Sequence, residues 1–203
     1  MTEAGGCGRC CFSFILTSGF TALFLWLSLR THKPKCSIES FYIPALNQSL
    51  NSSSDSTVFF DLRLKNQNKD KSVFYDAINL NLTLVDGGRR PVGNLTVAGF
   101  HQGRDKKAFR KGQVEARGVD WKAVRRNGSA VFRLDLATAV RYKILFWKTK
   151  RDNLRVGAEV KVNAQGAKEY PHGITLSSGA AVAGRSPAGA LWSVGALILW
   201  KFW

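Results

Sequence analysis

Apolar and polar residues alternate over most of the middle of the chain. In the segment TVFFDLRLKN, which begins at Thr57, every second residue is apolar and the residues between them include three charged side chains. The same alternation recurs in INLNLTLV, SAVFRLDL, RYKILFW and NLRVGAEVKVN. A period of two is typical of β-strands with one buried and one solvated face. The predicted inward-facing residues are Val58, Phe60, Leu62, Leu64, Ile78, Leu80, Leu82, Leu84, Phe132, Leu134, Leu136, Val140, Tyr142, Ile144, Phe146, Leu154, Val156, Ala158, Val160 and Val162.

Turn-forming residues separate these segments. They occur at Asn66–Lys71, at Asp86-Gly87-Gly88 and at Asn127-Gly128, and residues 47–56 form a longer polar loop. Asn, Asp and Gly tolerate the backbone conformations that tight turns need. About seven short strands without a helical period between them predict an all-β fold, an antiparallel β-sandwich.

The N-terminal region contains an apolar run of another kind. Residues 11–29, CFSFILTSGFTALFLWLSL, contain no charged side chain, and as a helix they would span about 28 Å, close to the ~30 Å of a bilayer core. Basic residues flank the run on both sides, so it predicts one N-terminal transmembrane helix. The alternative is a cleaved signal peptide, but the run is long for one and the following THKPKC contains no small-x-small cleavage site.

Two features disagree about the orientation of this helix. Basic residues after the run favour a cytosolic C-terminal side. Five Asn-x-Ser/Thr acceptors favour passage of that side through the secretory lumen instead: Asn47, Asn51, Asn81, Asn94 and Asn127. Because five acceptors carry more weight than the flanking charges, we expect residues 1–10 to be cytosolic and residues 30–176 to be an extracellular domain at the plasma membrane.

The C-terminal segment, residues 177–203, changes composition from small residues to apolar ones. With Ser178 as an attachment site, two small residues follow it, then a spacer at Ala181–Gly189 and an apolar tail at Ala190–Trp203. This arrangement is typical of a glycolipid-anchor (GPI) signal. Lys201 within the tail departs from the pattern, and the alternative is a tail that lies on the membrane surface or folds back.

The formal charge of +16 is unevenly distributed: from Phe100 onward there are 20 Lys and Arg against 7 Asp and Glu. Such an excess attracts acidic partners. The candidate basic surface comprises Arg104, Lys106, Lys107, Arg110 and Lys111. Aromatic residues among the basic ones would also suit nucleic acid, but the expected secretory topology excludes that partner. We therefore expect acidic cell-wall polysaccharide or lipid headgroups.

The four cysteines do not form a disulfide framework in the predicted domain. Cys7, Cys10 and Cys11 precede or begin the apolar run and are candidates for S-palmitoylation, or are merely tolerated small residues. A CxxCC cluster cannot close a four-ligand metal site. Cys36 either pairs with another chain or stays free. Zinc motifs, phosphate-binding glycine loops and nucleophile elbows are absent from the sequence, so we predict no cofactor and no enzymatic activity.

Three segments carry a resemblance to a known family. They are FFDLRLKNQNKDKSVFYDAINLNL, NLTVAGFHQGRDKKA and LATAVRYKILFWKTKRDNLRVGAEVKV, preceded by a cysteine-rich start and one apolar run. In this order they resemble the plant non-race-specific disease resistance and harpin-induced-like family, which carries a late embryogenesis abundant type-2 domain. The resemblance covers roughly Arg9 to Leu176.

This resemblance implies a fibronectin- or immunoglobulin-like sandwich, plasma-membrane residence and a non-catalytic role in defence against pathogens. It also implies an immune-regulatory partner at the cytosolic tail and attachment of the membrane to the cell wall. The alternative is a lipid-binding or dehydration-stress module. An apolar groove between the sheets would favour that alternative, whereas a filled core with a basic outer patch would favour the defence role.

Overall fold

The computed structural model describes residues 5–47, 56–144 and 146–178. The chain forms two α-helices, one short 3₁₀ helix and eleven strands within these ranges. In chain order they are α1 (Gly5–Leu29), β1 (Lys35–Tyr42), η1 (Pro44–Leu46), β2 (Thr57–Lys65), β3 (Ser72–Tyr75), β4 (Ile78–Leu84), β5 (Arg90–Val97), β6 (Phe100–Gln102), β7 (Lys107–Glu115), α2 (Trp121–Arg126), β8 (Ala130–Ile144), β9 (Trp147–Lys148), β10 (Asp152–Val162) and β11 (Ile174–Thr175).

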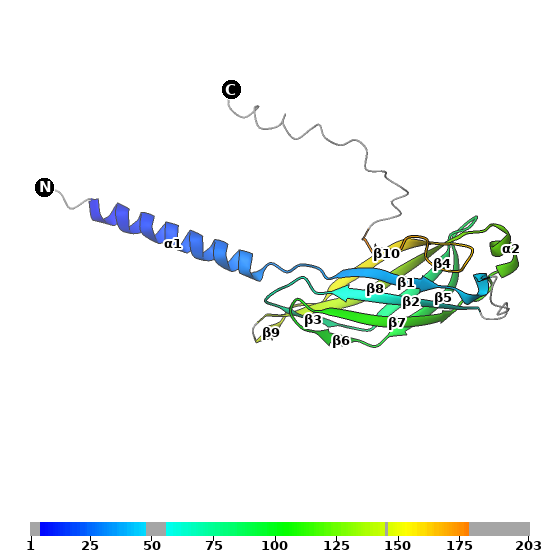
Figure 1. The fold of residues 1–203 in the computed structure, drawn as a ribbon. Helices are drawn as coiled ribbons and strands as arrows, with labels where there is room; N and C mark the ends of the chain where they lie inside the picture. The colour runs from blue at the N-terminus through cyan, green and yellow to red at the C-terminus, as the bar shows by residue number, and fades with distance from the viewer. Residues whose placement is uncertain (1–4, 48–55, 145, 179–203) are drawn as a thin grey trace, which may run out of the picture.

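The strands form two antiparallel sheets. One has four strands in the order β11-β1-β2-β7, and the other has seven, in which β5-β4-β8-β3-β6 is the main path and β9 and β10 pair with the other edge of β8. Figure 1 shows α1 leaving one end of this domain, while α2 lies at the opposite end. The prediction of an all-β, antiparallel fold is confirmed. The immunoglobulin-like topology stays a prediction.

Strand β8 organises the larger sheet because it is 15 residues long. It pairs with β4 and then β3 along one edge, and with β10 and then β9 along the other. The sequence suggested two separate strands here. They are one strand because the alternation of buried and half-buried residues continues unbroken from Ala130 to Tyr142.

The inner faces of the two sheets pack against each other, and most predicted inward residues are buried as expected. Phe41 of β1 contacts both Phe60 of β2 and Phe132 of β8, with ring centroids 6.4 and 5.9 Å apart. Leu62, Leu64, Leu134 and Leu136 and their neighbours on β4 and β10 belong to the same buried cluster. The space between the sheets is therefore filled by side chains, as in the interior of an ordinary globular protein.

The inward assignment of Phe146 was wrong, since 96% of this side chain is exposed. Strand β8 ends at Ile144 and the chain reverses into β9, where Trp147 pairs with Ile144. Reversal of the chain at this point ends the alternation, which the residues RYKILFW alone do not reveal. Ile144 and Val156 are only half-buried.

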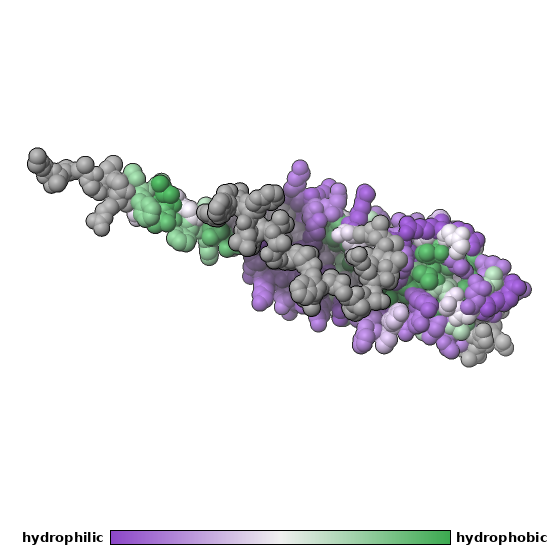
Figure 2. Space-filling view, turned by 90° about the horizontal axis from the view of Figure 1, so that it is seen from above, coloured by the Kyte–Doolittle hydropathy of each residue, from purple (hydrophilic) through white to green (hydrophobic). Residues whose placement is uncertain are grey.

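Helix α1 covers the predicted apolar run and extends it toward the N-terminus. Its described apolar side chains are exposed, for example Phe14 at 74% and Phe24 at 72%. Figure 2 shows these hydrophobic side chains standing apart from the hydrophilic surface of the domain. Across residues 5–47, 56–144 and 146–178, no helix combines enough length and apolarity to cross a membrane. The predicted helix at residues 11–29 is thus present, but the structure does not support its assignment as a transmembrane span.

Helix α2 was missed by the sequence analysis, which found no helical period between the predicted strands. The carboxylate of Asp120 caps this helix by accepting hydrogen bonds from the backbone N–H groups of Lys122 and Ala123. Asn127 and the left-handed Gly128 (φ 69°) end it. Asp before and Gly after a short segment are helix-boundary signals, and in a six-residue helix they outweigh the weak periodicity.

Candidate functional site

The five residues of the predicted basic surface do not form a single patch. Arg104 and Lys106 are exposed in the turn between β6 and β7. Lys107 and Lys111 are exposed on β7, two pleats apart, on the outer face of the four-stranded sheet. Arg110 is half-buried and belongs to the opposite, inner face of the strand. The alternation of side chains along β7 therefore removes Arg110 from the surface that the sequence assigned to it.

A row of lysines that the sequence analysis did not identify extends this surface. In the register of the sheet, Lys35 of β1 pairs with Lys65 of β2, which pairs with Lys107 of β7. Like charges directly opposite each other in a sheet repel. Within the described part of the chain, none of these three lysines forms an ion pair with a carboxylate. We call Lys35, Lys65, Lys107 and Lys111 the outer basic face. Only the strand register could reveal it, because its members are distant in the sequence.

The segment Gly99-Phe100-x-Gln102-Gly103, on which the family resemblance partly rested, has a structural role. The Phe100 ring stacks on Tyr75 at 4.7 Å, and the guanidinium of Arg110 lies 3.9 Å from the Phe100 centroid. A Cβ at Gly99 would lie 2.6 Å from the carbonyl oxygen of Tyr75, so only glycine fits there.

Gln102 connects the two sheets through its side chain. Its Nε2 donates to the carbonyl oxygens of Leu64 (2.9 Å) and Lys106 (2.8 Å). Its Oε1 accepts a hydrogen bond of 2.7 Å from the hydroxyl of Tyr75. Burial also raises the pKa of this Tyr75 hydroxyl well above its ordinary value, which keeps it a donor. The β6–β7 turn, and with it Arg104 and Lys106, is therefore held rigidly against β2.

The predicted turn at Asn66–Lys71 is largely buried rather than solvated. Asn66 Nδ2 donates to the carbonyl oxygens of Lys71 (2.8 Å) and Gly103 (2.9 Å). Asn68 exchanges two hydrogen bonds of 2.8 Å with the backbone of His32. Side-chain amides thus satisfy the backbone groups of three chain segments at once, as buried polar groups require.

The predicted glycosylation sites lie in different environments. Asn81 of β4 and Asn94 of β5 are exposed and directly opposite each other in the register of the seven-stranded sheet. Asn127 is exposed at the C-terminus of α2. Asn47 is half-buried, and its Nδ2 lies within hydrogen-bond distance (3.2 Å) of the Tyr42 hydroxyl. Asn51 lies outside the described residues.

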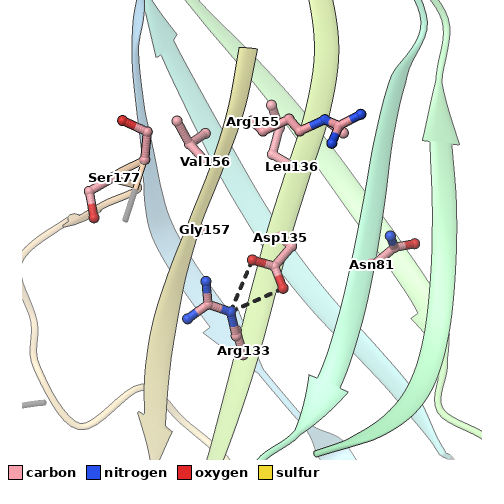
Figure 3. A pocket seen from close by; sticks show the side chains of 10 residues that line it. Asn81, Arg133, Asp135, Leu136, Arg155, Val156, Gly157 and Ser177 are labelled. Atoms are coloured by element: carbon pink, nitrogen blue, oxygen red, sulfur yellow. Dashed lines mark hydrogen bonds and ion pairs between the residues drawn. The ribbon is translucent and has the colours of Figure 1, made fainter. Parts of the chain in front are cut away.

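A pocket of about 370 Å³ lies beside one of these sites, on the outer face of the seven-stranded sheet. Figure 3 shows Arg133 and Asp135 of β8 pointing toward each other. Arg155 and Gly157 of β10 and Ser177 lie on one side of them, and Asn81 of β4 lies on the other. The Nε of Arg133 lies 3.0 Å from Oδ1 of Asp135, and its Nη1 lies 3.7 Å from Glu159 Oε1. The cation is thus already neutralised by two carboxylates, so the pocket offers little net charge to a ligand.

The cysteines and the predicted lipidation sites are only partly described. Cys7, Cys10 and Cys11 lie on α1, and the thiol of Cys11 is exposed. Ser178 is exposed at the end of the described chain and lines the pocket with Ser177. Residues 179–203, the rest of the predicted anchor signal, lie outside the described residues. Cys36 is free and buried in β1, and this burial raises the pKa of its thiol to about 12. The structure therefore favours a free, unreactive thiol over a disulfide with another chain.

Comparison with known proteins gives one strong similarity. The chain is 50% identical over 184 residues to Protein NDR1 of Arabidopsis thaliana, an alignment that covers 86% of this chain and 84% of that protein. No family model matches the chain. A crystal structure of a protein from Archaeoglobus fulgidus covers 66% of this chain and 97% of its own, but at 10% identity and a TM-score of 0.37 it supports no argument about the fold.

Proposed function

The chain belongs to the plant non-race-specific disease resistance and harpin-induced-like family, and from this membership we propose that it is a non-catalytic, membrane-associated component of plant defence against pathogens. The observation that carries the proposal is the 50% identity to Protein NDR1 over most of both chains. Residues 1–10 would bind an immune-regulatory partner, and the two-sheet domain would lie outside the cell and bind the wall.

Membrane association is supported by α1. Its exposed apolar side chains, such as Phe12 (66%), Phe14 (74%) and Phe20 (68%), are uncharged and continuous along the helix. Exposed apolar surface of this kind marks a contact with a membrane or another protein. Extraction of plant microsomes with alkaline carbonate distinguishes a helix embedded in the bilayer from one that lies on its surface. We include residues 177–203 in the proposal as a glycolipid-anchor signal.

Wall binding is supported by the outer basic face. Lys35, Lys107 and Lys111 are exposed and Lys65 is half-buried, and the row Lys35–Lys65–Lys107 brings three positive charges together across three strands. Acidic polysaccharide such as polygalacturonate would relieve their mutual repulsion. The filled core supports this role over the carriage of a lipid between the sheets.

The defence role is tested by expression of the full chain in Arabidopsis plants that lack Protein NDR1. The chain should restore resistance to a bacterial pathogen, measured as bacterial growth in leaves. A variant without residues 1–10 should accumulate equally and fail to restore it, because the partner-binding tail is gone. Equal rescue by that variant would contradict the role of the tail, and absence of rescue by the intact chain would contradict the defence role.

Wall binding is tested separately with polygalacturonate. The quadruple variant K35Q/K65Q/K107Q/K111Q should bind more weakly, and its binding should depend less on salt, because exposed charges are screened beyond about 8 Å at physiological ionic strength. The matched control, R89Q/R90Q/K122Q/R126Q, removes four exposed charges from the opposite end of the domain. Equal losses in both variants would show that net charge, rather than the outer basic face, governs binding.

A further inference from the structure

The end of the domain nearest α1 is held close to the helix by the backbone that connects them. Lys71 Nζ donates to the carbonyl oxygen of Arg30 at 2.8 Å, and Lys33 forms an ion pair with Asp152 at 3.6 Å. Arg30 directly follows Leu29, the last residue of α1, and consecutive Cα atoms lie about 3.8 Å apart. The β2–β3 and β9–β10 connections therefore lie beside the C-terminus of α1, at the end of the domain that faces the helix in Figure 1.

Two exposed aromatic residues occupy this α1-proximal end. Phe146 is 96% exposed and Trp147 is 62% exposed, and both lie where β8 reverses into β9. The base of the reversal is fixed, since Thr149 N donates to the Tyr142 carbonyl oxygen (2.8 Å) and Tyr142 N donates to Thr149 Oγ1 (2.9 Å). Adjacent aromatic side chains that are exposed to solvent indicate a contact surface. Trp is enriched where proteins contact lipid headgroups.

Cationic side chains surround these aromatics. Lys143 and Lys148 are exposed and opposite each other in the register of β8 and β9. The Nζ of Lys148 lies 4.2 Å from the centroid of the Phe74 ring, a cation–π contact that positions it. Of the nearby carboxylates, Asp70 and Asp152 are already paired with Lys71 and Lys33. Asp105 in the β6–β7 turn is outnumbered by Arg104, Lys106, Lys143 and Lys148, so the end retains an excess of positive charge.

A polar pocket of about 360 Å³ lies at the same end of the domain, and Phe74 and Lys143 are among the residues that line it. The rings of Phe74 and His101, whose centroids lie 4.4 Å apart with an interplanar angle of 40°, form one part of its lining. Ser72, Arg104 and Lys143 supply a hydroxyl, a guanidinium and an ammonium group from three different elements. Hydroxyl and cationic donors that converge on a small concave site suit a phosphate group, and Arg and Lys are the usual phosphate ligands.

We propose that the α1-proximal end docks onto anionic phospholipid of the membrane that holds α1, with a headgroup phosphate in this pocket and Phe146 and Trp147 at the boundary of the acyl chains. The inference rests on the membrane association of α1 proposed above. Docking sets the orientation of the domain: its long axis stands away from the bilayer, and α2 and the distal turns face outward.

The test uses the full chain in nanodiscs made of phosphatidylcholine alone or with phosphatidylserine. Amide hydrogen exchange at residues 146–149 should slow by about tenfold or more in the anionic discs, because basic residues near an anionic surface are attracted to it. A tenfold change corresponds to about 1.4 kcal/mol. The variants F146S/W147S and R104Q/K143Q/K148Q should lose this protection. Their controls, F59S/F109S and R89Q/R90Q/K122Q, change exposed aromatic and basic residues elsewhere on the domain and should retain it.

Equal exchange in the two kinds of disc would overturn the proposal. So would protection by inorganic phosphate in neutral discs without further slowing in anionic ones, which would assign the pocket to free phosphate. Protection by polygalacturonate but not by anionic discs would assign this end to the wall instead. If the chain fails to enter neutral discs, the membrane association of α1 is wrong. Docking is then tested by sedimentation with phosphatidylserine vesicles. The docking proposal requires that the wild-type protein binds these vesicles and that the F146S/W147S variant does not.

Discussion

The two sheets are built alike on their inner faces and differently on their outer faces. The outer face of the four-stranded sheet presents a row of lysines without carboxylate partners among the described residues, whereas the outer face of the seven-stranded sheet pairs Arg133 with Asp135 and Glu159. The second face also presents Asn81 and Asn94, two candidate glycosylation sites. The lysine row is thus suited to attract an acidic partner, whereas Arg133 is neutralised by its carboxylate partners and lies near sites suited to carry glycans.

This difference separates stability from function in the two sheets. Buried apolar residues stabilise both inner faces through the same hydrophobic effect, in proportion to the area removed from water. Like charges opposite each other in a sheet do not stabilise it, so the row of lysines is consistent with the proposed binding of an acidic partner. On the seven-stranded sheet, Arg133 forms its ion pairs with Asp135 and Glu159 of the same domain. Four predictions test this comparison.

The largest effect should come from the inner faces, where the sheets are equivalent. Leu62→Ala in the four-stranded sheet and Leu134→Ala in the seven-stranded sheet should each lower the free energy of unfolding by about 2–5 kcal/mol, because both side chains are at least 98% buried and leave a cavity. Urea denaturation of the full chain measures it. Arg155→Ala, at an exposed position, should change the value by no more than about 0.5 kcal/mol. A loss confined to one sheet would show that the two do not share a core.

The next effect concerns the connection between the sheets. Gln102→Leu should lower the free energy of unfolding by about 1–3 kcal/mol, since the carbonyl oxygens of Leu64 and Lys106 lose their donor and the Tyr75 hydroxyl loses its acceptor. The same denaturation experiment applies. Gln113→Leu on the exposed face of β7 serves as the control and should be close to neutral. Equal effects of both changes would mean that the buried bonds of Gln102 add nothing to stability.

A smaller effect should distinguish the outer faces directly. Arg133→Gln should destabilise by about 1 kcal/mol because it removes charged hydrogen bonds to Asp135, whereas Lys65→Gln should leave stability unchanged or raise it by up to about 0.5 kcal/mol by relieving like-charge repulsion. Thermal unfolding at low and high salt provides the measurement. The Lys65→Gln difference should shrink at high salt. Destabilisation by Lys65→Gln at both salt concentrations would show that the lysine row has a structural role.

The smallest effect on the domain itself should come from its glycans. Asn81→Gln and Asn94→Gln should each remove one endoglycosidase-sensitive step in gel mobility from protein made in plant microsomes, provided that the neighbouring sites do not exclude each other. Neither change should alter polygalacturonate binding, because both sites lie on the sheet opposite the outer basic face. An unshifted wild-type protein would contradict the extracellular position of the domain. If each single variant keeps the full wild-type shift, glycans at these facing positions are mutually exclusive.

The fold class was accessible from the sequence because burial in a sheet has a period of two. Val58 to Leu64, Ile78 to Leu84 and Phe132 to Leu136 followed this period, and all of their predicted inward residues are buried. Phe146 fits the period of two in the sequence, but its side chain is exposed because the chain reverses between β8 and β9. Helix α2 has only six residues, too few to show a helical period of apolar residues. The residues that indicate its boundaries are Asp120 before it and Gly128 after it.

By itself the sequence determined most of the core residues on the alternating strands, the presence of an apolar helix that ends at Leu29, and the family to which the chain belongs. Each of these depends on neighbouring residues or on their order along the chain. The tertiary structure decided what gathers on the surface. Lys35, Lys65 and Lys107 became one row, and Arg110 left the patch, through strand register and pleat. His101, Arg104 and Lys143 came to line one pocket in the same way. Pairing between distant strands sets these contacts, and it is governed by packing of the whole domain, which no local pattern of residues encodes.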